Sequence, residues 1–432
     1  MRMLPLLIGP AFFACSAAGS GGHPHDGDGG GTGTGSNGGD GGGTGTDTAD
    51  ARPGSVDAGT QTTCTNGLGA WTGHDNVAAS QNPPCGLAPD AVPQFVSIGF
   101  DDNAYSGLPG TNGTGGLTWA LDMLKARNVH ASFYLSSIYI DVWESESPTF
   151  VKRAWHRIMT DGNEIANHTV NHGHGAMYDA ATWTTEMNGC IASVTKPFDP
   201  NEVDYSPDNT KGIGATKDQL VGFRTPFLEY DNATFTALEQ LGYHYDCSIE
   251  DGWQEDQDGT NFFWPYTLDN GSPGNEVLVG WGSKEHITDH PGLWELPVSP
   301  VIVPPDDKCA QYGVPSGLRN TLHDRVSWFD PASGKITGFD YNLWVEFRMT
   351  KAEFLATMKY TLDLRLAGNR APFMFGAHPD TYSSKYTAVP NASLEERQQA
   401  IEEFLDYALS KPEVRFVPNQ EILSWVRNPV PL

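Results

Sequence analysis

Residues 95–102 read FVSIGFDD, an apolar run that ends in two adjacent carboxylates. Its β-branched and aromatic residues predict a short buried strand, and the polar end is typical of a strand that opens into a site. Residues 163–167 (NEIAN) repeat the pattern, because they end in a polar cluster that begins with His168 and ends with His172. The sequence therefore predicts strands whose carboxyl ends deliver chemically active side chains.

Helical spacing alternates with short strands through most of the chain. Strands are predicted at residues 95–100, 129–135, 163–167, 221–224, 243–249, 372–377 and 415–418, and helices at 117–126, 150–159, 181–194, 233–241, 351–367, 394–410 and 419–427. This alternation predicts parallel βα units, and seven or so of them fit an α/β barrel. Residues 250–345 break the rhythm, with strand-like pieces only at 276–280 and 294–303, and predict long loops that form substrate walls.

Several strand ends carry candidate catalytic residues. They are Asp101 and Asp102, His168 and His172, Arg224, and His378. The carboxyl ends of the strands share one face of a parallel barrel, so these side chains can meet. One carboxylate and two imidazoles form a zinc ligand set that leaves a position open for water, and HxxxH spacing lets two rings turn to one side. Each residue alone could be an ordinary turn, surface or core residue, but their common position favours catalytic zinc.

The first 15 residues have the order of a secretory signal. Arg2 precedes a short apolar run, and small residues and Cys15 follow. Cys15 resembles a bacterial lipobox cysteine, although Phe12 stands where Leu is usual, so lipidation and plain cleavage both stay open. We expect export to the cell envelope or outside the cell. The longest apolar stretch, residues 3–14, is shorter than the roughly 20 residues of a spanning helix, so only a lipid anchor would contact the membrane.

The rest of the chain divides by composition. Residues 16–63 are rich in Gly and contain no Leu, Ile, Phe, Trp or Tyr, which predicts a disordered linker. Residues 64–91 form a short lead-in segment bounded by cysteines, and 92–432 form the catalytic domain. The formal net charge of -27 argues against nucleic acid as a partner.

Cysteine use agrees with export to an oxidising compartment. Setting Cys15 aside, five cysteines leave at least one thiol free or paired between chains. The preferred pairs are Cys64 with Cys85 and Cys190 with Cys247, and Cys309 is left over. Spacing does not determine connectivity, so both pairs are hypotheses.

Four ordered motifs resemble a known family: GFDD at 99–102, HTVNH at 168–172, RTPF at 224–227 and GAH at 376–378. They are similar to polysaccharide deacetylases of the NodB-homology group, carbohydrate esterase family 4, over roughly residues 92–432. Residues 92–102, 264–266, 294–297 and 417–429 look more like the animal-type chitin deacetylase branch. The resemblance implies a distorted (β/α)7-type barrel with long loops.

The resemblance also implies a metal site and a base. Asp102, His168 and His172 would bind Zn²⁺, or another divalent transition metal such as Co²⁺. Asp101 would take a proton from the attacking water. Arg224 would keep Asp101 ionised, through a guanidinium that can grip a carboxylate with two parallel hydrogen bonds.

The same resemblance implies how the leaving group and the oxyanion are handled. His378 would protonate the departing amine, and the backbone N–H of Phe227 would stabilise the oxyanion. The family's Asp-Trp pair, whose Asp tunes the catalytic His, is only loosely present, with Asp251 and Asp246 as candidates. Gly99 departs from the usual Thr or Ser.

Other residues near these motifs have two readings. Trp253 and Trp264, like Trp281 and Trp294, could stack on sugar rings, and about half of these four are expected to be core residues. His174 could extend the metal shell or be a surface residue.

The leading hypothesis is an exported, metal-dependent N-deacetylase of an N-acetylglucosamine polymer or oligomer, acting as a monomer. Chitin or chitooligosaccharide is favoured, and peptidoglycan is second. A catalytically inactive carbohydrate-binding lipoprotein and an amide hydrolase for small substrates stay open as alternatives.

Overall fold

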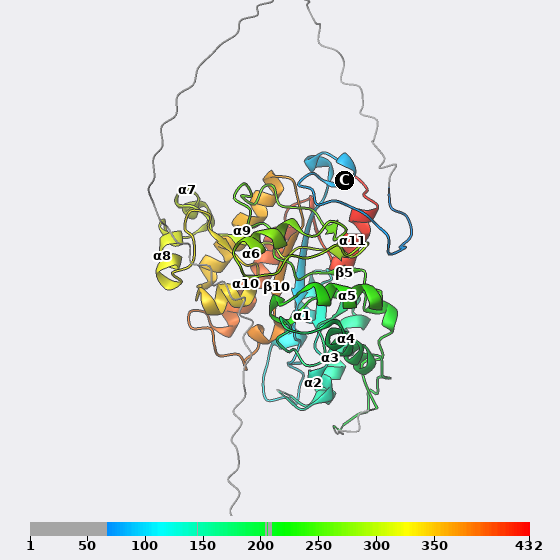
Figure 1. Ribbon diagram of the computed structural model, residues 1–432. Helices are drawn as coiled ribbons and strands as arrows, with labels where there is room; N and C mark the ends of the chain where they lie inside the picture. The colour runs from blue at the N-terminus through cyan, green and yellow to red at the C-terminus, as the bar shows by residue number, and fades with distance from the viewer. Residues whose placement is uncertain (1–66, 145, 204, 206–209) are drawn as a thin grey trace, which may run out of the picture.

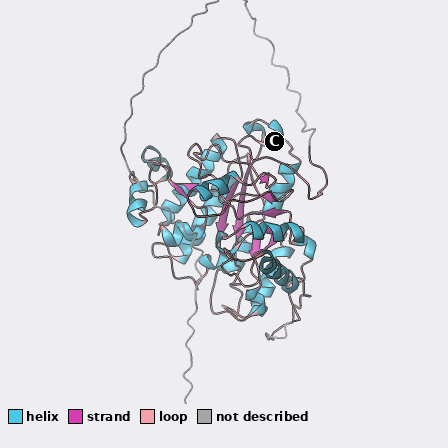
Figure 2. Cartoon of the chain, viewed as in Figure 1, coloured by secondary structure: helices cyan, strands magenta, loops and turns pink. Residues whose placement is uncertain are grey.

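The computed structural model describes residues 67–144, 146–203, 205 and 210–432. Strands gather in the middle of the molecule and helices surround them (Figure 1, Figure 2). None of the helices in these residues has the length and apolar character needed to span a bilayer. The predictions for residues 1–63, including Cys15, lie outside the described residues.

The strands and helices follow one another along the whole described chain. The strands are β1 (Gln94–Phe100), β2 (Ser132–Leu135), β3 (Glu164–Asn167), β4 (Gly222–Phe223), β5 (Tyr245–Asp246), β6 (Tyr266–Thr267), β7 (Trp294–Glu295), β8 (Val301–Ile302), β9 (Lys335–Ile336), β10 (Phe373–Ala377) and β11 (Val414–Phe416). The α-helices are α1 (Gly116–Ala126), α2 (Ile138–Asp141), α3 (Pro148–Thr160), α4 (Ala180–Val194), α5 (Asn232–Leu241), α6 (Pro273–Gly280), α7 (Asp306–Cys309), α8 (Leu318–Arg325), α9 (Lys351–Ala367), α10 (Leu394–Leu409) and α11 (Asn419–Arg427).

The main sheet has nine strands and is almost entirely parallel. Its order is β10-β1-β2-β3-β4-β5-β7-β6, and β11 also pairs with β1. Only the β6–β7 pair is antiparallel. The two ends of this path, β10 and β6, do not pair with each other in the described residues, so the barrel is incomplete. This is the distorted α/β barrel that the motifs predicted.

The alternation of β1 decides which side chains enter the site. Successive strand residues face opposite sides of a sheet. Val96, Ile98 and Phe100 pack with the helices in one apolar cluster. Phe95 packs in a second cluster, with residues of β5, β7 and β10. Asp101 lies an even number of positions after Phe95, so its side chain faces the same side as Phe95, the interior of the barrel.

The structure corrects the prediction of a strand at residues 276–280. That stretch is the second half of α6. The residues that begin this helix outweigh the strand preference of the β-branched residues in it. Ser272 accepts a hydrogen bond from the backbone N–H of Asn275, and Pro273 takes the first helical position. Residues 294–303 form two short strands, β7 and β8, with a break between them.

The segment before β1, blue in Figure 1, lies beside α11 near the C-terminus. Asp75 accepts hydrogen bonds from Arg427 Nε at 2.6 Å and from the Trp294 indole N–H at 2.8 Å. The Trp71 ring stacks on His244 with centroids 4.0 Å apart. The lead-in segment is therefore packed against the barrel.

The structure contradicts the Cys190–Cys247 pair. Both thiols are free and buried, and they belong to different apolar clusters on opposite faces of the sheet. Cys309 is also free. Cys85 is disulfide-bonded, but Cys64 lies outside the described residues, so their pairing stays a prediction.

Candidate metal centre and active site

Asp101, Asp102 and Asn103 follow β1 directly, where the strand leaves the sheet. Asp102 and Asn103 have φ angles of 65° and 64°, a left-handed conformation that Asp and Asn adopt more readily than most residues. The Asn103 amide donates to the carbonyl oxygens of Phe100 and Tyr134, each at 2.8 Å. This turn holds both carboxylates at the carboxyl end of the strand.

Asp102, His168 and His172 come together at this end of the barrel. Asp102 Oδ1 lies 2.8 Å from His172 Nε2 and 3.6 Å from His168 Nε2. One possible ligand atom from each residue lies within 4.8 Å of the other two. Two imidazole nitrogens and one carboxylate oxygen are the donor set of a catalytic zinc site. The three side chains predicted as ligands therefore fit a divalent transition metal.

The ring of His168 is oriented by the neighbouring backbone. Its Nδ1 lies 2.7 Å from the carbonyl oxygen of Arg224. Since a carbonyl only accepts, Nδ1 carries the proton and Nε2 keeps its lone pair toward Asp102. Burial, together with the neighbouring His172, lowers the pKa of His168 to about 3. His168 is therefore neutral, as a metal ligand must be.

Arg224 follows β4 and places its guanidinium against Asp101. Nη1 donates to Asp101 Oδ1 at 2.8 Å, while Nε and Nη2 donate to the carbonyl oxygen and Sγ of Cys247 at 2.9 and 3.0 Å. The carboxylate thus receives one hydrogen bond and not the expected two, because Cys247 takes the other donors. The guanidinium also lies 4.2 Å from the centre of the Tyr134 ring. Its orientation is therefore set on several sides.

Gly99 explains how the guanidinium fits. A Cβ atom at this position would lie 2.7 Å from Arg224 Nη1 and 2.9 Å from Cε2 of Tyr134. Both distances are well below the roughly 3.5–4.0 Å of ordinary non-bonded contacts. The departure from Thr or Ser at this position makes room for the group that contacts Asp101.

We expect Gly99→Ala to lower kcat about 10²-fold with the metal still bound, because displacing Arg224 by about 1 Å misplaces Asp101. Metal analysis and acetate release measure the two effects separately. Gly280→Ala is the matched control, since a Cβ there meets nothing within 4 Å. Full activity in Gly99→Ala would show that the position of the guanidinium does not matter.

Asp101 has the electrostatic surroundings of a general base. Burial raises the pKa of its carboxyl to about 6, while Arg224 and His378 oppose that rise. A cation bound at Asp102 would also oppose this rise in the pKa, because it adds positive charge beside the carboxylate. A base with a pKa below but near neutral pH is ionised and still accepts a proton well.

His378 follows β10, and its partner is Asp340. His378 Nδ1 lies 2.7 Å from Asp340 Oδ1, and the backbone N–H of His378 donates to Asp340 Oδ2 at 2.9 Å. Asp340 is fully buried. Its two contacts fix both the ring and the backbone of His378.

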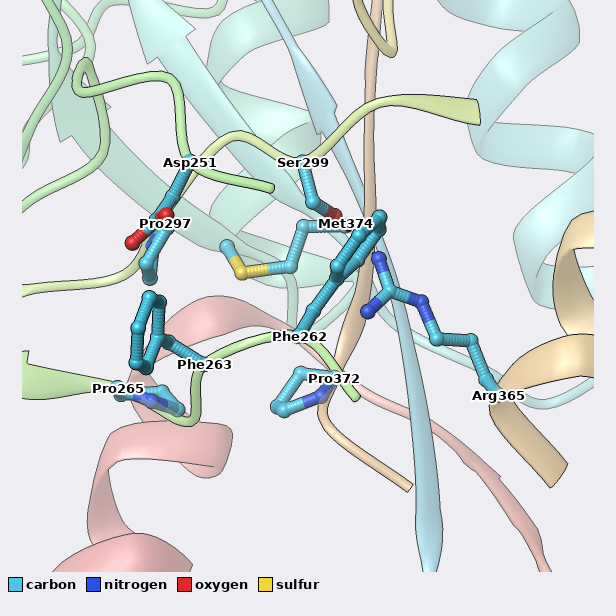
Figure 3. Close-up of a pocket in the computed structure, with 9 residues that line it drawn as sticks. All are labelled: Asp251, Phe262, Phe263, Pro265, Pro297, Ser299, Arg365, Pro372 and Met374. Carbon is cyan, nitrogen blue, oxygen red and sulfur yellow. Dashed lines mark hydrogen bonds between the residues drawn. The ribbon is translucent and has the colours of Figure 1, made fainter. Parts of the chain in front are cut away.

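Asp246 and Asp251 were the residues expected to tune His378, and both predictions are wrong. Asp246 instead accepts the backbone N–H and the hydroxyl of Ser248, each at 2.8 Å. Asp251 lines a small cavity with Arg365, and Figure 3 shows apolar side chains between these two residues. The carboxylate that reaches the His378 ring comes from a later segment of the chain.

A signal for Asp340 was present in the sequence. Gly338-Phe339-Asp340 repeats Gly99-Phe100-Asp101. Phe339 pairs with Gly376 through an isolated parallel bridge, so this segment lies beside β10 much as a strand would. It was missed because it lies in the irregular stretch 250–345.

The turn at Phe227 borders the metal ligands. Its φ angle is 57°, and its ring lies edge-on to His172, with centroids 4.7 Å apart. The ring also stacks on His174 at 4.0 Å. His174 pairs with Glu229 at 3.0 Å and its side chain is 60% exposed, which favours the surface reading of that residue.

Of the four tryptophans that could stack on sugar rings, two are core residues and two reach the surface. Trp264, one of the two predicted as substrate contacts, is among the core residues. Trp264 is fully buried, and its indole N–H donates to the carbonyl oxygen of Asn369 at 3.2 Å. It is a core residue and cannot stack on a sugar, so its prediction as a substrate contact is wrong. Trp294 is also buried, whereas Trp253 and Trp281 reach the surface.

Comparisons with known proteins agree with the family resemblance of the motifs. Residues 89–245 match the family model described as polysaccharide deacetylase. Chitin deacetylase 8 of Bombyx mori is 23% identical over 361 residues, which cover 82% of this chain and 76% of that protein. A solved structure from Mycobacterium smegmatis, assigned as a polysaccharide deacetylase, aligns with a TM-score of 0.45 and 19% identity over 81% of this chain and 95% of that one.

Residues 89–245 match the polysaccharide deacetylase family, which is the family that the motifs predicted. Two side-chain pairs, Asp101–Arg224 and His378–Asp340, accompany one cluster of three possible metal ligands, a carboxylate and two imidazoles.

Proposed function

We propose that this protein is an exported, metal-dependent N-deacetylase of an N-acetylglucosamine polymer or oligomer, with chitin or chitooligosaccharide as substrate. The observation that carries the proposal is the cluster of Asp102, His168 and His172 beside a buried, Arg-paired Asp101. The similarity to a chitin deacetylase over most of both chains supports the choice of substrate.

The geometry suits hydrolysis of an acetamide. A divalent ion at the three ligands would supply Lewis-acid polarisation and make water more acidic. Asp101, held by Arg224, accepts the proton of the attacking water. His378 presents Nε2 to the departing nitrogen and gives it a proton, since Nδ1 is occupied by Asp340. The backbone N–H of Phe227 donates to the oxygen that becomes negative.

Acetate release tests this function directly. The purified protein, loaded with Zn²⁺ or Co²⁺, is incubated with chitin oligomers, peptidoglycan, acetylated xylan and a small acetamide. We expect release from the chitin oligomers, and none after chelation. Release from peptidoglycan alone would show that peptidoglycan, and not chitin, is the substrate. Glycan binding without any acetate release would contradict the proposed enzymatic function and favour a carbohydrate-binding protein.

Asp340→Asn tests the pairing with His378. We expect kcat/KM to fall by about 10² or more, because a general acid typically contributes about 10² to 10⁴ in rate and the amide no longer stabilises a protonated ring. The alkaline limb of the pH profile should move to lower pH, since the ring loses its proton more easily. Asp251→Asn is the control and should leave that limb in place. An unmoved limb in Asp340→Asn would contradict the role of Asp340.

The proposal of export rests on the sequence of the amino terminus. We propose that residues 1–15 act as a signal and that Cys15 is lipidated, which would anchor the protein in a bacterial envelope. Labelling with a radioactive fatty acid should mark the full chain but not Cys15→Ser. Label-free, secreted wild-type protein would instead indicate simple cleavage.

A further inference from the structure

Arg365 carries a buried positive charge in the last turn of α9. Its side chain is fully buried, and its Nη2 donates to the hydroxyl of Ser299 at 2.7 Å. The guanidinium also lies 3.8 Å from the centre of the Phe262 ring. Within the described ranges, Nε and Nη1 have no hydrogen-bond partner. Because an arginine stays protonated in proteins, two donor atoms of a charged group lack an acceptor from this part of the chain.

The guanidinium borders a small cavity. Arg365, Asp251 and Ser299 are its polar lining residues, and the other lining side chains are apolar. Figure 3 shows the Arg365 side chain reaching from its helix toward Phe262 and Met374, into the group of residues around the cavity. The cavity has a volume of about 10 Å³, which is enough for one water-sized molecule or ion.

This cavity lies where the barrel is incomplete. β6 and β10 are the two ends of the main sheet, and they do not pair with each other in the described residues. Pro265 directly precedes β6 and Met374 belongs to β10, and both residues line the cavity. A bound ion would therefore contact both sides of this seam.

Asp251, the acid in the cavity lining, does not balance the charge of Arg365. Its Oδ1 accepts the backbone N–H of Gly252 at 2.8 Å, and its Oδ2 accepts the hydroxyl of Tyr266 at 3.4 Å. Burial raises the pKa of Asp251 to about 7, so at neutral pH this carboxyl supplies only part of a negative charge. Burial lowers the pKa of Arg365 to about 9, which still leaves the guanidinium charged.

We propose that the cavity binds one small monovalent inorganic anion, chloride or an ion of similar size, through Nε and Nη1 of Arg365. An uncompensated buried charge is strongly destabilising, and hydrogen bonds between a guanidinium and an anion are charge-assisted. Sulfate and phosphate are larger and need more donors than the apolar walls offer. The site shares no residue with the metal centre, so its role is to stabilise the folded barrel and not to take part in deacetylation.

Thermal unfolding of the full-length protein tests this site. The midpoint Tm is measured in sodium chloride and in sodium gluconate at equal ionic strength, because gluconate is too large for a cavity of about 10 Å³. We expect Tm to rise by about 1–3 °C for each tenfold increase of chloride above its Kd, and to stay constant in gluconate. Arg365→Met should abolish the rise, since Met keeps an apolar chain and removes the donors.

Arg427→Met is the matched control. Arg427 is also a buried arginine, but it has an ion pair with Asp75 at 2.6 Å. This variant should lower Tm and keep the chloride dependence of the wild type. An equal chloride dependence in Arg365→Met and the wild type, or none in the wild type, would overturn the anion site.

Crystals of the wild type grown in sodium bromide give a second measurement, which decides the question even if Arg365→Met does not fold. Bromide resembles chloride and has a strong anomalous signal. We expect one anomalous peak in hydrogen-bond contact with Nε or Nη1 of Arg365. Electron density for a water at this position, without an anomalous peak, would show that a neutral molecule completes the hydrogen bonds and would overturn the proposal.

Discussion

Asp101→Asn is expected to keep its metal and to lose activity by about 10² to 10⁴, the usual contribution of a general base. The amide has nearly the same shape, and its oxygen can still accept the hydrogen bond from Arg224 Nη1, which is 2.8 Å long in the wild type. It cannot accept a proton from water. Asp101 is also outside the group of possible metal ligands, so metal content and acetate release should separate.

Asp75→Asn is the matched control for this substitution. Asp75 is likewise a buried carboxylate that pairs with an arginine, Arg427, at 2.6 Å, but it lies against α11. We expect it to lower the midpoint of thermal unfolding while the folded enzyme keeps its kcat. If Asp101→Asn lost metal and activity together, Asp101 would be a ligand, and the roles of Asp101 and Asp102 would be exchanged.

The parallel strands were the predictable part of this molecule. A strand that runs from apolar residues into Asp101 or His168 has a strong local pattern, and parallel pairing brings such ends to one side without any further information. This reasoning placed Asp102, His168 and His172 together, and the structure does so within 4.8 Å. The same logic brought Arg224 to this face, and the family resemblance implied its pairing with Asp101, which the structure shows at 2.8 Å.

Long-range contacts from irregular segments were not predictable in the same way. Asp340 reaches His378 through a segment that makes one isolated bridge to β10, so no periodic pattern announces it. Residues 276–280 look like a strand, yet the capping residue Ser272 lies outside that window and starts a helix. Cys190 and Cys247 failed as a pair because sequence spacing does not say which face of a sheet a side chain takes.

Gly99 shows what a departure from a family pattern can mean. Read from the sequence, it removes a side chain and no proposed ligand. In the structure, that missing side chain is the space into which the Arg224 guanidinium fits. A small residue on β1 thus makes room for the guanidinium that contacts Asp101.

His168→Ala is expected to weaken metal binding by more than about 100-fold, since loss of even an outer partner of a ligand commonly costs about 10- to 100-fold. The substitution removes one nitrogen of three proposed donors and also frees the Arg224 carbonyl that orients the ring at 2.7 Å. Activity should fall to the level of the chelated wild type. Mass spectrometry of the native protein measures the metal directly.

His174→Ala distinguishes a ligand from a nearby histidine. His174 lies two residues after His172, but it stacks on Phe227 and pairs with Glu229 at the surface. We expect this variant to keep one metal ion per chain and most of the wild-type activity. Metal retention in His168→Ala together with metal loss in His174→Ala would move the site to the other side of Phe227. Metal loss in His168→Ala alone would instead leave Asp102, His168 and His172 as the set whose donor atoms lie close enough to bind one ion.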